Sequence, residues 1–193
     1  MKQFTFARGM WDPAELPMTY APMCRAFSDV RQEDDAIVNS CSEKNGYDYI
    51  GLSLREPLSG GVSVSAHCSF ENYGAPLLVF GDSIHTDAEG RRLWGPIYEI
   101  VAYESGCNVW RVLPDPSNPE RPFSAVNLAR ETFTVAAGSV IDLSARVVNR
   151  RAAVRVNDYR FEIDLPELPE TFYVGITLCE GINRFYDLKV ESV

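Results

Sequence analysis

Strict alternation of apolar and polar residues is the feature that most limits how this chain can fold. In the segment 61–70, every second residue is apolar: Val62, Val64, Ala66, Cys68 and Phe70. Successive side chains of a β-strand point to opposite faces, so this segment places one face in a core and the other against solvent or a partner. His67 belongs to the polar face. A helix cannot produce this period of two.

Further short strands are predicted in the second half of the chain, at 141–147, 152–156, 159–164, 172–178 and 185–190. Two short segments, 149–151 (Asn-Arg-Arg) and 157–158 (Asn-Asp), stand between the first of these strands. Asn and Asp are typical of the tight turns that join antiparallel strands. The first sixty residues are less regular and predict clean strands only at 36–38 and 49–54. The segment 127–132 is the one short stretch that favours a helix. The sequence therefore predicts an all-β protein.

The length of 193 residues, 46% of them hydrophobic, fits one well-buried core and predicts a single domain over 1–193. The loop 114–122, rich in Pro, Asp and Ser, is interpreted as a surface excursion. About a dozen short strands in one domain favour two stacked antiparallel sheets over a small closed barrel. We expect a jelly-roll β-sandwich of two curved sheets with minimal helix.

The charge balance argues against several kinds of partner. Eighteen Lys and Arg against 27 Asp and Glu give a net charge of −9, which is the wrong sign for holding nucleic acid. No apolar stretch approaches the ~20 residues that cross a bilayer, so no membrane partner is expected. The first residues lack the apolar centre of a signal peptide, which predicts a cytoplasmic protein.

The cysteines and histidines do not form a recognisable metal or disulfide pattern. Five cysteines are spread without any CxxC pair, and His67 and His85 are the only histidines. We therefore expect reduced thiols, no structural zinc and no cofactor. Asp82, Asp87 and Glu89 lie in one loop and leave a calcium site open as an alternative, although their spacing is not that of an EF-hand.

The end of the chain resembles a known superfamily. The segment 172–190, preceded by the meander 147–164, is similar to the closing strands of concanavalin A-like lectin/glucanase jelly rolls, including laminin-G-like and bacterial glycan-utilisation proteins. The resemblance implies that one curved sheet carries a saccharide cleft on its concave face. It also implies that the first strand, at 4–7, pairs beside the strand that ends at Val190.

The retaining glucanases of that superfamily carry Glu-x-Asp-x-Glu on a concave strand, and this chain lacks the motif. Retaining hydrolysis needs two carboxyl groups ~5 Å apart on one side. The nearest segment, 94–111, contains Glu99 and Glu104, which have opposite parity. Glu99 is the candidate catalytic acid. In the alternative, both glutamates are ordinary strand residues that are solvated or bound to a neighbouring arginine.

The same segment is the candidate saccharide-binding site, because rings that stack on sugars occur there beside groups that bind hydroxyls. Its candidates are Trp94, Tyr98, Tyr103, Asn108, Trp110 and Arg111, joined by His67 and Arg146 from other strands. Trp110 fits either a stacking platform or a core position. His67 fits a sugar contact or an exposed position.

Two functions from different classes follow. In the first, the protein binds or processes an oligosaccharide in bacterial glycan metabolism. In the second, it is a non-catalytic module whose sheet face docks another protein or a second copy in a homodimer. The positions of Glu99, Trp110, His67 and Arg146 distinguish the two functions: convergence on one surface would favour a saccharide site, and scatter would favour a docking module.

Overall fold

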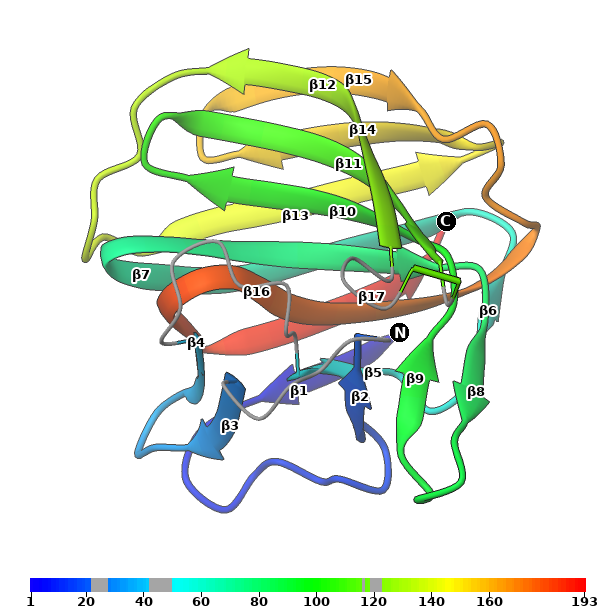
Figure 1. Ribbon diagram of the computed structural model, residues 1–193. Helices are drawn as coiled ribbons and strands as arrows, with labels where there is room; N and C mark the ends of the chain where they lie inside the picture. Colours follow the sequence, from blue (N-terminus) through cyan, green and yellow to red (C-terminus); the bar gives the residue numbers. More distant parts are fainter. Residues whose placement is uncertain (22–27, 42–49, 116, 119–122) are drawn as a thin grey trace.

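The computed structural model describes residues 1–21, 28–41, 50–115, 117–118 and 123–193 (Figure 1). This part of the chain contains strands, turns and bends and no helix. It therefore contains no helix long and apolar enough to span a membrane. The strands are arranged in two layers that face each other.

The first layer is an antiparallel sheet that includes the two ends of the chain. Its strands, in spatial order, are β15 (Tyr159–Asp164), β14 (Arg151–Val156), β13 (Ile141–Val148), the first half of β7 (Val62–Gly81), β17 (Asp187–Ser192) and β1 (Lys2–Thr5). In β1, Lys2 pairs with Val190 and Phe4 with Leu188. The predicted pairing of the first strand with the last is confirmed.

The second layer begins at β12 and continues through the other half of β7. Its main strands are β12 (Phe123–Thr132), β11 (Gly106–Pro114), β10 (Ile97–Tyr103), β7, β16 (Thr171–Phe185), β5 (Ile50–Ser53) and β2 (Met18–Tyr20). Two short segments extend this layer: β6 (Leu58–Ser59) pairs with the start of β16, and β9 (Arg92–Trp94), paired in turn with β8 (Ile84–Thr86), lies beside β2. The strand β4 (Ile37–Cys41), followed by β3 (Ser28–Gln32), pairs with the end of β16, which lies beside the first half of β7.

The strands β7 and β16 run through both layers, so the two sheets are hydrogen-bonded into one continuous, folded sheet (Figure 1). The change of layer in β7 follows Asn72, whose φ of 42° is left-handed. Opposite it, Gly181 in β16 has a φ of 76°, and a Cβ there would lie 2.2 Å from the carbonyl oxygen of Tyr73. Only glycine fits this close approach.

The core lies between the layers and is built as the alternation predicts. Val62, Val64 and Phe70 of β7 are buried in it, while Ser63, Ser65 and His67 point away. The second layer contributes Leu78, Phe80, Tyr98 and Ile100 to the same core. The arrangement confirms an all-β sandwich with minimal helix, in which every strand pairing that the structure describes is antiparallel except that of β2 with β9.

The expected helical piece at 127–132 is wrong, because these residues belong to β12. Asn127 pairs with Trp110 and Thr132 with Gly106, with a bulge between the pairs at Val109 and Trp110. The local helical preference of this segment is weak, and the pairing of nine residues with β11 overrides it.

Candidate functional site

The β10–β11 hairpin divides the predicted site residues between two faces of the second layer. Its register pairs Glu99 with Trp110 and Tyr98 with Arg111. Side chains alternate along a strand and paired residues share a face, so Glu99 and Trp110 lie on the outer face and Tyr98 and Arg111 on the core side. Residues that are neighbours in the sequence therefore do not form one cluster.

The outer face of the hairpin brings together Glu99, Tyr103, Asn108 and Trp110. We call these four residues and Val79 of the adjacent strand β7 the candidate face. Val79 pairs with Glu99, so these two side chains and Trp110 form one row across three strands. The Tyr103 hydroxyl donates to Asn108 Oδ1 at 3.3 Å. Tyr103, Asn108 and Trp110 are half-buried, so part of each remains open to a ligand.

Glu99 is the chemically unusual residue of this face. Its side chain is 2% exposed, and Oε1 has no hydrogen-bond partner among the described residues. Burial raises the pKa of Glu99 to about 8, because the charged form would lose its hydration without gaining a partner. The carboxyl group is therefore protonated at neutral pH and can donate a hydrogen bond or a proton.

Trp94, from β9, closes one end of the face instead of offering a ring to a ligand. It is 1% exposed and packs on two glycines of the neighbouring strands. A Cβ at Gly81 would lie 2.5 Å from the Trp94 ring, and one at Gly175 would lie 3.0 Å from it. The two glycines therefore provide the space that the indole occupies.

Tyr98 and Arg111 form a structural cluster at the end of the sandwich. The guanidinium group of Arg111 donates to both carboxylate oxygens of Asp82, at 3.0 and 2.6 Å, and lies 4.3 Å from the centre of the Tyr98 ring. The Tyr98 hydroxyl accepts a hydrogen bond from the backbone of Glu167. Both side chains are occupied by these contacts and do not reach the candidate face.

His67 and Arg146 project from the outer face of the first layer. His67 pairs with Asp142 across β7 and β13, and Arg146 pairs with Ser63. The His67 ring contacts Asp187, with Nδ1 2.7 Å from Oδ2. Of the four residues expected to converge, the structure brings Glu99 and Trp110 together and places His67 and Arg146 on the other layer.

The contact with Asp187 predicts a pH effect. The hydrogen bond to Asp187 raises the pKa of His67, because the carboxylate favours the imidazolium form. Because the pKa is higher in the fold than in the unfolded chain, where it is 6.5, protonation of His67 stabilises the fold fully below pH 6.5. This contribution is lost as the pH rises through the pKa of the folded state. His67 is 56% exposed, so the gain stays under about 1 kcal/mol. NMR titration should show a lower His67 pKa in Asp187→Asn; an unchanged value would contradict the pairing.

The three loop acids considered for calcium each bind an arginine. Asp82 pairs with Arg111, whereas Asp87 and Glu89 both pair with Arg91, at 2.7 and 2.8 Å. No group of three metal-binding side chains is found among the described residues. The calcium alternative therefore receives no support from the loop geometry.

Three of the five cysteines lie where the structure describes their side chains. Cys68 and Cys107 are buried free thiols, and Cys41 is also buried. Burial raises the pKa of the Cys107 thiol to about 12, which keeps it protonated. Cys24 and the side chain of Cys179 lie outside the described residues.

Sequence reasoning did not single out Arg92 and Tyr173, which also lie beside this face. Tyr173 of β16 pairs with Gly81 and is half-buried against the same apolar cluster as Trp110. Arg92 donates to Ser53 Oγ, and burial lowers the pKa of Arg92. No local sequence signal could have identified Arg92, because β9 has three residues and reaches the face only through tertiary pairing.

No protein-family model matches the chain, and no curated protein matches its sequence. Solved structures match its fold. The cellulose-induced protein Cip1 has a TM-score of 0.66 at 14% identity, over 100% of this chain and 98% of its own. The carbohydrate-binding module CBM66 from Bacillus subtilis has a TM-score of 0.62 at 9% identity, covering 89% of this chain and 98% of its own. The protein has a concanavalin A-like jelly-roll fold.

A third structure of this concanavalin A-like group is a family 16 endo-glucanase from Bacteroides ovatus. Its TM-score is 0.59 at 12% identity, over 98% of this chain and 99% of its own. These matches confirm the resemblance inferred from the closing strands. Because the identities are low, they establish the fold alone, and a ligand has to be argued from the residues of the candidate face.

Proposed function

We propose that the protein binds an oligosaccharide on the candidate face. The observation that carries the proposal is the position of Trp110, a half-buried ring beside the buried acid Glu99 and near the polar pair Tyr103 and Asn108. A ring supplies a stacking surface for the C–H face of a sugar, and the amide and hydroxyl groups bind sugar hydroxyls. The structural neighbours include a carbohydrate-binding module and an endo-glucanase, which supports the same ligand class.

The proposal is for binding without cleavage. Glu99 is the only carboxylic acid in β10, in β11 and in residues 74–81 of β7. Glu104 is exposed in the turn between β10 and β11. A retaining mechanism needs a second carboxyl group ~5 Å away on the same face, and these strands do not supply one. In a binding site, the protonated Glu99 serves as a hydrogen-bond donor.

Trp110→Ala tests the proposal. We expect about 5- to 150-fold weaker oligosaccharide binding, by analogy with base stacking on an aromatic ring, which contributes about 1 to 3 kcal/mol. A glycan array would identify the ligand, and calorimetric titration would measure its affinity for the wild type and the variant. Tyr159→Ala is the control, since Tyr159 is an exposed ring of the first layer. Its affinity should equal that of the wild type.

Two results would count against the proposal. Unchanged affinity in Trp110→Ala would reject this face as the binding site. A wild-type protein that binds no glycan at all would favour the second function, a module whose sheet face docks another protein. Glu99→Gln adds a further check, because it should abolish turnover only if the protein has a hydrolytic activity.

A further inference from the structure

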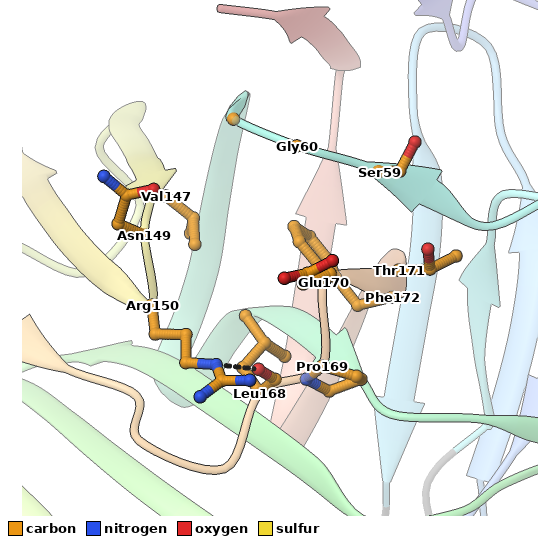
Figure 2. A pocket seen from close by; sticks show the side chains of 11 residues that line it. Ser59, Gly60, Val147, Asn149, Arg150, Leu168, Pro169, Glu170, Thr171 and Phe172 are labelled. Carbon is orange, nitrogen blue, oxygen red and sulfur yellow. Dashed lines mark hydrogen bonds between the residues drawn. The ribbon is translucent and has the colours of Figure 1, made fainter.

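A hollow of about 450 Å³ shares no residue with the candidate face, and Figure 2 shows the side chains that line it. Three turns form its rim: residues 59–61 between β6 and β7, Asn149 and Arg150 between β13 and β14, and residues 168–170 before β16. Val147 and Phe172 form the apolar part of the lining. The proposed saccharide function does not use this hollow.

Arg150 brings a positive charge to the hollow from a fixed position. Its Nε donates to the carbonyl oxygen of Leu168 at 2.9 Å (Figure 2). Its own carbonyl oxygen accepts from the Leu165 backbone at 2.7 Å. Its φ of 62° is left-handed, a conformation in which glycine is the usual residue. The two terminal nitrogens of the guanidinium group have no partner among the described residues and remain available.

Glu170 brings a negative charge to the same hollow. Its carbonyl oxygen accepts from the Gly60 backbone at 3.3 Å, which fixes the main chain beside the rim. Its carboxylate group forms no ion pair with Arg150 or with any other residue that the structure describes. Arg150 and Glu170 therefore both line the hollow without pairing, and the Arg150 side chain is held by its bond to Leu168.

These charges restrict the chemistry of a ligand. A purely anionic ligand would be repelled by Glu170, and a purely cationic one by Arg150. The one ring in the lining, Phe172, is 2% exposed and offers no face for stacking. The hydroxyls of Ser59 and Thr171 supply further hydrogen-bonding groups.

We propose that this hollow binds a small zwitterion of the amino acid or short-peptide type, with its carboxylate on Arg150 and its ammonium group on Glu170. Two free guanidinium nitrogens match the two oxygens of a carboxylate, which is the pairing that arginine makes best. A free amino acid and a short peptide carry the same two charged ends at different separations.

Titration of the full chain with glycine, diglycine and triglycine tests the proposal, with NMR shifts or calorimetry as the readout. At least one of the three ligands should bind, and the ligand with the highest affinity shows whether the hollow suits a free amino acid or a peptide. N-acetylglycine and glycinamide each lack one charge, and each should bind at least about tenfold more weakly than glycine if glycine is the ligand. If a peptide binds best, its N-acetylated and amidated forms are compared instead.

Arg150→Gly and Glu170→Gln should each weaken binding at least about tenfold. Glycine suits the left-handed backbone at position 150, so Arg150→Gly removes the side chain with little risk to folding, and a thermal melt verifies this. Arg146→Gln on β13 is the charge-matched control and should bind as the wild type does. The proposal is overturned if no member of the series binds, if the singly charged analogues bind equally well, or if folded Arg150→Gly retains full affinity.

Discussion

Glu99→Gln should stabilise the protein at pH 8 by about 4 kcal/mol. The Glu99 carboxyl group is buried, and its pKa is about 8 in the fold against an ordinary value of 4.5. Between these values the folded chain holds a proton that the unfolded chain has released, so stability falls as pH rises. Each unit of difference corresponds to about 1.4 kcal/mol, and glutamine has no proton to lose.

Urea unfolding between pH 4.5 and 8 would measure this effect. The free energy of unfolding of Glu99→Gln should vary less with pH than that of the wild type, and the two proteins should differ little near pH 4.5. Glu104→Gln is the matched control, because Glu104 is exposed in the adjoining turn and its replacement should leave the pH profile unchanged. Parallel profiles for the wild type and Glu99→Gln would show that Glu99 titrates normally.

Much of the fold follows from the alternation of residues along single strands. The segment 61–70 predicts both its strand and its buried face, since the period of two needs no tertiary information. The length of β7 could not be predicted in the same way. Its 20 residues change layer after Asn72, and that change depends on the close approach of Gly181 from a strand about 110 residues later in the chain.

The candidate face could be predicted in part from the hairpin. A turn at residues 104–105 lies midway between Glu99 and Trp110, which is enough to pair them and to place both on one face. The same alternation places Tyr98 and Arg111 on the opposite face from Glu99 and Trp110. The burial of Glu99 has no such local origin, because alternation alone places Glu99 on the face that points away from the main core.

Trp94→Ala should lower the free energy of unfolding by about 3 to 5 kcal/mol, the usual cost of truncating a buried tryptophan. The Trp94 ring is 1% exposed and lies on Gly81 and Gly175. Because neither glycine has a side chain that could move into the space, the cavity left by the indole cannot collapse easily. The loss should therefore approach the upper end of the range.

Trp110→Ala is the matched comparison, since it removes the same side chain from a half-buried position of the same apolar cluster. Its loss of stability should be clearly smaller than that of Trp94→Ala, because water already reaches part of the ring and less apolar area is uncovered. Urea unfolding of both variants at one pH makes the comparison direct. A larger loss for Trp110→Ala would mean that Trp110 supports the fold more than Trp94 does. It would also remove the basis for treating Trp110 as a surface that a sugar can reach.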